Sequence, residues 1–234
     1  LVQISKKNKV KKFIYATTCS VYGVSSSPNV VETDEPKPIT DYNKYKGLCE
    51  PILDKYLDDD FNGIIIRPAT VCGFSEKMRF DLTVNILTNF AFNKGYIKVF
   101  GGKQSRPNLH IDDMCDLYKM LISRDVKNIN GEIFNAGTEN LRIIDVATKV
   151  KNIIKKRYNK KIEIRVEESA DIRSYMINSD KIKNILSFEF KRSVDDAIND
   201  LCDAFDSKII EDSFSDKWSN IKVLSEMQKM GKLN

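Results

Sequence analysis

The stretch of sequence that decides the fold is "KKFIYATTCSVYG" (residues 11–23). It begins with a short apolar run and passes into small hydroxyl residues, a pattern typical of a buried strand that enters a loop. A second apolar run, "NGIIIRP" (residues 62–68), follows a segment in which apolar residues recur at helical spacing. A strand, a helix and a strand in this order form a βαβ unit, which builds a parallel sheet with helices on its faces. The sequence therefore predicts an α/β fold.

The rest of the chain predicts a more mixed region of helices and strands. Asp112 or Asp113 is expected to cap one of these helices. Pro51 falls inside the helix that begins near Tyr42, where a proline can kink or break it. Helical patterns cover residues 81–95, 111–123, 142–156 and 193–205, and strand patterns cover residues 96–102, 131–138 and 161–168.

Composition excludes several classes of protein. The chain has 234 residues, of which 41% are hydrophobic and 30% charged, as in ordinary globular proteins. Its net charge of +5 comes from lysines spread over the whole sequence, which indicates a solvated surface and no nucleic-acid partner. No apolar run approaches the roughly 20 residues of a membrane span. Five widely spaced cysteines predict reduced thiols in a cytoplasmic protein, and a single histidine excludes a multi-histidine metal site, so we expect no metal.

Tyr42 and Lys46 are four residues apart and therefore share one face of a helix. A lysine ammonium one turn away favours the phenolate form of a tyrosine, which can then accept a proton from a substrate hydroxyl. The alternative is two ordinary polar residues on a solvated helix. Thr17 and Thr18 end the first strand, and ligands of open α/β sheets bind at the carboxyl ends of parallel strands. The alternative to a ligand-binding role is that the Thr17 and Thr18 hydroxyls only cap backbone groups at the end of the strand.

Five motifs in order resemble the extended short-chain dehydrogenase/reductases of the nucleotide-sugar epimerase/dehydratase group. They are "FIYATTCSVYG", "YNKYK", "IIIRPATVCG", "IKVFGGKQSRPNLHIDDM" and "DIRSYMINSDK", and they span roughly residues 11–181. The resemblance implies the C-terminal part of a Rossmann-type parallel sheet plus a smaller mixed α/β substrate-binding region. It implies NAD or NADP as cofactor, a nucleotide sugar as substrate, and a homodimer formed through the helix that carries Tyr42.

The resemblance also assigns roles to individual residues. It implies a catalytic set of Thr18, Tyr42 and Lys46, in which Tyr42 is the acid/base. Cofactor contacts are implied for Ala16, Thr17, Tyr42, Lys46, Pro68 and Val71. Substrate contacts are implied for Thr18, Asp81, Leu82, Lys98, Phe100, Arg106, Asp171 and Arg173, where Phe100 flanks the base and Arg106 holds the diphosphate. For His110 we expect a structural role in its loop.

Two departures from the family pattern bear on the reaction. Cys19 and Ser20 stand at the two positions where the pattern of the 4,6-dehydratases has Asp-Glu. Neither side chain is a competent general acid at neutral pH, which argues against a reaction that eliminates water. The glycine-rich G-x-x-G-x-x-G motif that cradles the cofactor pyrophosphate is absent from this sequence. We therefore expect an N-terminally truncated fragment with doubtful activity of its own. We expect residues 1–67 and 108–137 in the dinucleotide-binding part, 68–107 and 138–210 in the sugar-nucleotide part, and 211–234 in a helical tail.

The predicted function is hydride transfer at sugar C4 by an NAD(P)-dependent nucleotide-sugar epimerase or C4 dehydrogenase. Two alternatives remain open: a catalytically silent nucleotide-sugar-binding protein of the same fold, and a 4,6-dehydratase or 4-keto reductase. The sugar, the nucleotide and the choice between NAD and NADP are not specified by these residues.

Overall fold

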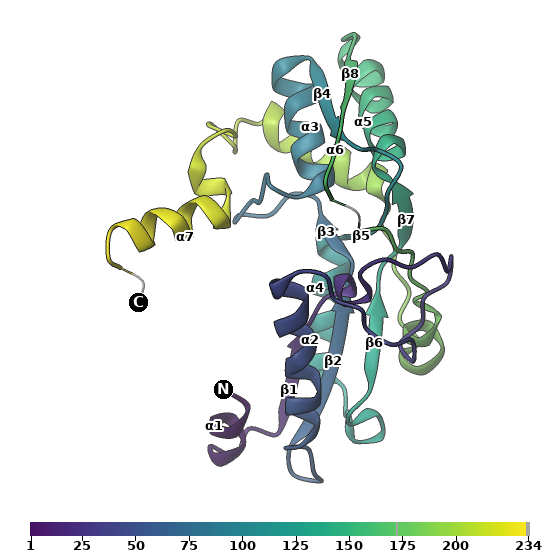
Figure 1. Cartoon of the computed structure of the whole chain (residues 1–234), viewed down its shortest axis with the longest axis vertical. Coiled ribbons are helices and arrows are strands. Elements are labelled where there is room, and N and C mark those ends of the chain that lie inside the picture. Colours follow the sequence, from purple (N-terminus) through teal and green to yellow (C-terminus); the bar gives the residue numbers. More distant parts are fainter. Residues whose placement is uncertain (172, 233–234) are drawn as a thin grey trace. The chain divides into compact units, whose positions relative to one another are not determined.

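The computed structural model describes residues 1–171 and 173–232, and the chain divides into two compact units (Figure 1). Each unit is assembled from three segments that are separated in the sequence. Unit one comprises residues 1–71, 104–141 and 171–192, and unit two comprises residues 72–103, 142–170 and 193–234.

Unit one is built on a parallel three-stranded sheet with the order β1-β2-β6. Ile14 of β1 pairs with Ile64 of β2, and Ile66 of β2 pairs with Phe134 of β6. The βαβ prediction is confirmed, because α2 connects β1 to its parallel neighbour β2. The strands are β1 (Lys12–Ala16), β2 (Asn62–Pro68) and β6 (Ile133–Ala136).

Helices and a second sheet complete unit one. The second sheet has the order β3-β5-β7, and two of its strands begin or end at the boundary between the units. These elements are α1 (Val2–Lys7), α2 (Asp41–Asp54), α4 (Ile111–Ser123), β3 (Thr70–Cys72), β5 (Ser105–His110) and β7 (Glu139–Arg142). Short helical turns cover Cys19–Tyr22, Lys127–Ile129 and the π-helix Ile182–Leu186.

The core of unit one lies on both faces of the parallel sheet. Ile64 and Ile66 point into one apolar cluster together with Leu117 and Leu121 of α4. Ile65, on the opposite face, packs in a second cluster with Leu53 of α2. This alternation follows from the pleat of a strand whose two faces are both covered, and it explains why the run of isoleucines is continuous.

Unit two contains a helical layer and a small parallel sheet of β4 and β8, which Figure 1 draws with α3, α5 and α6. Helix α3 ends at Gly95, whose left-handed backbone closes the helix, and α6 begins with a capping box of Ser193 and Asp196. Its elements are α3 (Thr83–Lys94), β4 (Tyr96–Phe100), α5 (Ile143–Tyr158), β8 (Glu163–Glu167), α6 (Val194–Asp206), the short helix Asp216–Trp218 and α7 (Asn220–Lys229).

Two local expectations require correction. His110, and neither Asp112 nor Asp113, caps α4: its Nδ1 accepts the backbone N–H of Asp112 at 3.1 Å, because an imidazole nitrogen one residue before the helix reaches that donor. Pro51 does not break α2, which continues as one helix to Asp54.

The segment 171–192 lies in unit one. It is attached by isolated parallel bridges that join Val24 to Ser174 and Val30 to Ile177. Over residues 1–171 and 173–232, none of the helices has the length and apolar content that crossing a membrane requires.

Candidate active site at the carboxyl ends of the parallel strands

The two threonines that follow β1 differ in their surroundings. The backbone N–H of Thr17 donates to the carbonyl of Ile66 at 2.8 Å and so extends the pairing of β1 with β2. Its side chain is buried, and its Oγ1 has no hydrogen-bond partner among the described residues. Thr18 is only half-buried, and its Oγ1 accepts the backbone N–H of Ser20 at 3.2 Å, which starts the short helical turn after the strand. Of the two threonines, Thr18 is the more exposed.

Tyr42 and Lys46 lie in the first half of α2, as the spacing predicted. The Tyr42 side chain is 61% exposed. The Lys46 Nζ donates to the carbonyl of Ala16 at the end of β1 and lies 4.7 Å from the ring centroid of Tyr15. The Tyr15 hydroxyl donates back to the Lys46 carbonyl at 3.0 Å. Partial burial lowers the pKa of Lys46. The ammonium is thus held at the strand end, and the phenol one turn before it faces outward.

A chain of polar side chains connects Thr18 to the residue after Tyr42. The oxygens of Thr18 and Ser20 lie 2.8 Å apart, and Ser20 Oγ donates to Asn43 Oδ1 at 2.6 Å. Ser20 and Asn43 are both buried, and the backbone N–H of Asn43 donates to Thr40, the residue that caps α2. The structure thus brings the loop of Thr18 and the first turn of α2 together, although residues 18 and 43 are far apart in the sequence.

A buried ion pair fixes α2 against β2. Glu50 accepts two hydrogen bonds from Arg67, at 3.1 Å to Nε and 2.7 Å to Nη2, and both side chains are almost fully buried. Arg67 Nη1 also donates to the Tyr22 hydroxyl at 2.7 Å. The Cys19 thiol donates to the Arg67 carbonyl at 2.7 Å, and complete burial raises its pKa. The helix that carries Tyr42 and the loop that carries Thr18 are therefore attached to the same strand.

The two other residues predicted to line the cofactor belong to neighbouring strand ends in unit one. Pro68 is the last residue of β2 and is half-buried. Val71 lies in β3 and is also half-buried. Ala16, the acceptor for Lys46, ends β1.

Arg106, Asp171 and Arg173 form one cluster in unit one. Arg106 Nη2 donates to Asp171 Oδ2 at 3.0 Å, and its Nη1 donates to the carbonyl of Arg173. The Arg173 guanidinium donates two hydrogen bonds to the same carboxylate, from Nε to Oδ1 at 2.8 Å and from Nη2 to Oδ2 at 2.7 Å. The hydrogen bonds from Arg173, together with the charge of Arg106, lower the pKa of Asp171. Two guanidinium groups on one carboxylate leave a net positive charge, which suits a phosphate ligand.

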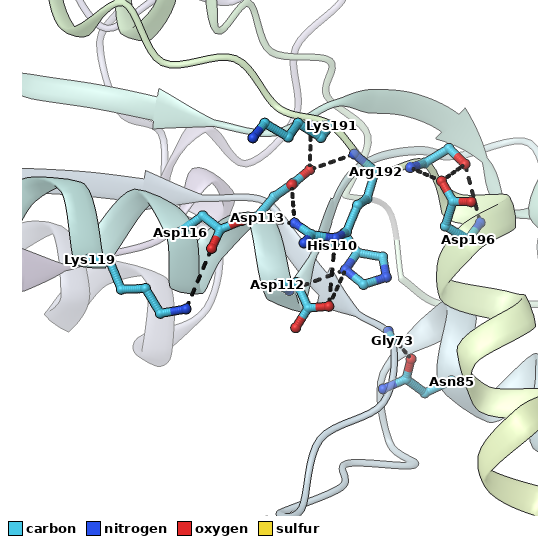
Figure 2. Close-up of polar contacts among 11 residues, drawn as sticks. Gly73, Asn85, His110, Asp112, Asp113, Asp116, Lys119, Lys191, Arg192 and Asp196 are labelled. Atoms are coloured by element: carbon cyan, nitrogen blue, oxygen red, sulfur yellow. Dashed lines mark hydrogen bonds and ion pairs between the residues drawn. The ribbon is translucent and has the colours of Figure 1, made fainter.

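The segment 171–192, which carries Asp171 and Arg173, is attached to the start of α4 through Lys191 and Arg192 (Figure 2). Asp113, which is buried, accepts the backbone N–H groups of Lys191 and Arg192 at 3.0 and 2.9 Å and the Arg192 Nη1 at 2.8 Å. The Asp113 carboxylate thus attaches the C-terminal end of the segment 171–192 to α4. His110 is buried at the preceding position and caps the helix, so its role in this structure is structural.

The remaining predicted substrate residues lie in unit two. Asp81 accepts two hydrogen bonds from Arg79, at 3.0 and 2.8 Å, and Leu82 is the residue that precedes α3. Lys98 pairs with Glu167 at 2.9 Å, and its Nζ lies 5.7 Å from the ring centroid of Phe100, which is half-exposed on β4. The structure therefore separates the predicted substrate residues between the two units.

Sequence reasoning missed Ser20, Asn43 and Tyr15 as parts of this site. Ser20 stands out in the sequence only as a departure from the dehydratase pattern. Asn43 adjoins Tyr42, but no spacing rule links an asparagine at the start of a helix to a serine in a loop more than twenty residues before it. The only signal in the sequence is that these side chains carry hydroxyl or amide groups, which can form hydrogen bonds.

The fold and this site define a class of protein: a Rossmann-like α/β protein whose polar groups gather at the carboxyl ends of parallel strands. Residues 1–137 match the model of the "NAD dependent epimerase/dehydratase family", and the chain belongs to that family.

Relatives of known name are similar to parts of the chain. It is 28% identical over 113 residues to the GDP-6-deoxy-D-talose 4-dehydrogenase of Aggregatibacter actinomycetemcomitans. The aligned residues cover 48% of this chain and 37% of that protein. It is 24% identical over 221 residues to the UDP-glucose 4-epimerase of Lactobacillus helveticus, and this alignment covers 85% of this chain and 65% of that protein.

A solved structure, the UDP-glucuronic acid 4-epimerase of Bacillus cereus in complex with UDP-glucuronic acid and NAD, superposes with a TM-score of 0.77 at 25% identity. That superposition covers 88% of this chain and 65% of the other. The chain thus spans less than two thirds of the length of these relatives, between 37% and 65%.

Proposed function

We propose that the protein acts as an NAD(P)-dependent nucleotide-sugar epimerase or C4 dehydrogenase, with Tyr42 as the acid/base at the C4 hydroxyl. The observation that carries the proposal is the polar chain that joins the half-buried Thr18, through Ser20, to the first turn of the helix of Tyr42. Among the relatives, two 4-epimerases and a 4-dehydrogenase support this chemistry, while others are named dTDP-glucose 4,6-dehydratases.

The residues at the end of β1 fit the nicotinamide half of the cofactor. Lys46 holds an ammonium at the Ala16 carbonyl, and the buried Thr17 hydroxyl has no partner within the described part of the chain. Lys46 would bind the ribose, while Pro68 and Val71 would line the nicotinamide. When bound, the nicotinamide supplies a two-electron oxidant or reductant for the sugar carbon. Tyr42 would take the hydroxyl proton as the alcohol is oxidised and return it on reduction, and the Lys46 charge would stabilise the phenolate.

The substrate would be a nucleotide sugar whose diphosphate meets the positive cluster of Arg106 and Arg173. Asp171 holds both guanidinium groups in place. For Phe100, a contact with the base stays a prediction from the family resemblance, as do substrate contacts for Asp81, Leu82 and Lys98.

The surroundings of Cys19 argue against a dehydratase. Elimination of water from the sugar requires a general acid near the substrate. Cys19 is fully buried, donates to a backbone carbonyl, and has a pKa raised by that burial. Ser20 is a neutral hydroxyl engaged with Asn43. Neither side chain can deliver a proton to a leaving hydroxyl at neutral pH.

We propose that the chain forms a homodimer through the outward face of α2. Leu53 is buried against the sheet, whereas Leu48 and Ile52 are 50% and 49% exposed and follow Tyr45 at helical spacing. An exposed apolar stripe of this kind is typical of an interface. We also propose that the protein is cytoplasmic, where its five free thiols would remain reduced.

Product analysis tests the proposed reaction. The complete protein, as its gene encodes it, would be incubated with NAD or NADP and a panel of nucleotide sugars, and the products separated and identified by NMR. We expect either the C4 epimer or a 4-keto sugar that retains its C6 oxygen. A 4-keto-6-deoxy product would instead establish the dehydratase, and binding of the sugars without any turnover would establish the silent protein.

A further inference from the structure

Tyr15, near the end of β1, contacts Lys46 at two points. The Lys46 Nζ lies 4.7 Å from the centroid of the Tyr15 ring, and the Tyr15 hydroxyl donates to the Lys46 carbonyl at 3.0 Å. We propose that Tyr15 is a positioning residue for the proton transfer, which fixes the ammonium of Lys46 one helical turn from Tyr42. This inference rests on the proposed function, in which the Lys46 charge stabilises the phenolate of Tyr42.

The pleat of β1 places Tyr15 on the face of the sheet that α2 covers. Side chains of a strand alternate between its two faces. Tyr15 and Phe13 pack with Leu53 of α2. Ile14, which lies between them in the sequence, packs in the cluster on the opposite face. Tyr15 is the second-last residue of β1, and its ring meets α2 in the first half of the helix, at Lys46.

The Ala16 carbonyl is the other group that holds the ammonium. The backbone N–H of Thr17 donates to Ile66 of β2, and in a trans peptide the preceding carbonyl points the opposite way. The Ala16 oxygen therefore faces away from β2, and it accepts the Lys46 ammonium. The carbonyl engages one N–H of the ammonium and the Tyr15 ring covers a second side. The direction that is left would serve the cofactor ribose.

Both groups that hold the ammonium are neutral. A carbonyl dipole and the electron-rich face of an aromatic ring attract a cation without cancelling its charge. A carboxylate in their place would neutralise the ammonium and weaken its effect on a neighbouring phenolate. Glu50, one turn further along α2, is paired with Arg67 instead. Burial raises the pKa of Tyr15, so its hydroxyl remains a neutral donor.

The Tyr15 ring also offsets the cost of burying the Lys46 charge. Lys46 is half-buried, and this partial burial lowers its pKa. Attraction to a ring face favours the charged form and so opposes that loss. Without this ring face the Lys46 side chain would be less restrained and more often uncharged. Both changes would make the free amine more reactive, which provides a chemical readout that needs no cofactor.

Acetylation of Lys46 tests the contact in the complete protein without added cofactor. Acetic anhydride modifies uncharged amines, and mass spectrometry gives the rate at each lysine. Lys44 is exposed on the same helix, so the ratio of the Lys46 rate to the Lys44 rate corrects for the reagent and for the state of the helix. We expect Tyr15→Leu to raise this ratio about fivefold to tenfold. Tyr15→Phe keeps the ring face and should leave the ratio within about twofold of wild type.

A ring-fluorinated phenylalanine at position 15 separates the electrostatics of the ring from its bulk. Fluorine withdraws electron density from the ring face, so the shape is nearly kept while the attraction for the ammonium weakens. Relative to Tyr15→Phe, we expect an acetylation ratio about threefold higher in this variant. The turnover number with an active nucleotide sugar should fall about threefold, with the dissociation constant of the sugar changed by less than about twofold. A role in packing alone would move neither the ratio nor the turnover.

The outcomes for Tyr15 and for the proposed function are distinct. Equal acetylation ratios in Tyr15→Phe and its fluorinated counterpart, or a Tyr15→Leu ratio equal to wild type, overturn the inference and leave the proposed function intact. A changed ratio with unchanged turnover also overturns it, because Tyr15 would then hold Lys46 without serving the reaction. If wild-type protein turns over none of the nucleotide sugars, the proposed function fails, and the role of Tyr15 in proton transfer fails with it. Should Tyr15→Leu not fold, the comparison of the two phenylalanine variants decides alone.

Discussion

Removing Glu50 should destabilise unit one strongly, because its partner Arg67 would remain charged inside the protein. The Arg67 and Glu50 side chains are 3% and 7% exposed, and two hydrogen bonds of 3.1 and 2.7 Å join them. Loss of one member of such a buried pair costs about 3–5 kcal/mol. Arg67 retains the Tyr22 hydroxyl at 2.7 Å and the carbonyl of Glu32 at 3.2 Å. We therefore expect Glu50→Leu to lower the free energy of unfolding by about 3 kcal/mol, the lower end of that range.

A double-mutant cycle distinguishes the buried charge from ordinary loss of packing. Glu50→Leu, Arg67→Met and the double variant would be unfolded in urea and followed by far-UV circular dichroism. The double variant contains no unpaired charge, so we expect it to be more stable than Glu50→Leu by at least about 1 kcal/mol. The only tryptophan, Trp218, lies in unit two, so its fluorescence reports separately on that unit. A cost below about 1 kcal/mol for Glu50→Leu, or simple additivity of the two substitutions, would refute the reasoning.

Three further predictions concern the pH dependence of stability, the association of subunits, and the turn after the Thr18 loop. The pKa of Asp171 is depressed in the folded protein, so its stabilising contribution is present above the unfolded value of about 4 and is lost as the pH falls through the folded pKa. Asp171→Asn should therefore show a shallower loss of melting temperature below about pH 4 than wild type, and parallel curves would contradict this. Leu48→Glu should convert a dimer to a monomer in light scattering, while the exposed Lys55→Glu should leave the dimer intact. Gly23 has a φ of 66°, and a Cβ there would collide with the Lys37 carbonyl oxygen. Gly23→Ala should therefore lower the free energy of unfolding by about 1–3 kcal/mol, measured in urea. An unchanged urea midpoint would exclude that strain.

Much of the parallel sheet could be predicted because its signal is local. The isoleucine run of β2 is buried on both faces, and that burial requires a continuous apolar segment, which is visible in the sequence. Tyr42 and Lys46 could be placed on one helix for the same reason, since their spacing alone determines their common face. The α2 helix also begins with Thr40, a residue whose hydroxyl caps the first turn.

Elements that depend on tertiary contacts could not be predicted from the sequence. Strand β5 contains Arg106, Pro107 and Asn108, residues that rarely indicate a strand, and it is a strand because it pairs between β3 and β7. The chain of Thr18, Ser20 and Asn43 likewise exists only because the loop after β1 returns to the start of α2. The meeting of Arg106 with Asp171 is not evident from the sequence either, since the family resemblance relates each of them separately to the nucleotide.

The most direct test of the account is the substitution of Tyr42 by phenylalanine in the complete protein. The aromatic ring and the helix remain, while the hydroxyl proposed to exchange the proton is removed. Turnover of the nucleotide sugar found active in the product screen would be measured alongside its dissociation constant. We predict a loss of turnover of about 100-fold to 10,000-fold with the dissociation constant changed by less than about threefold. Turnover equal to that of wild type would contradict the assignment of Tyr42 as the acid/base.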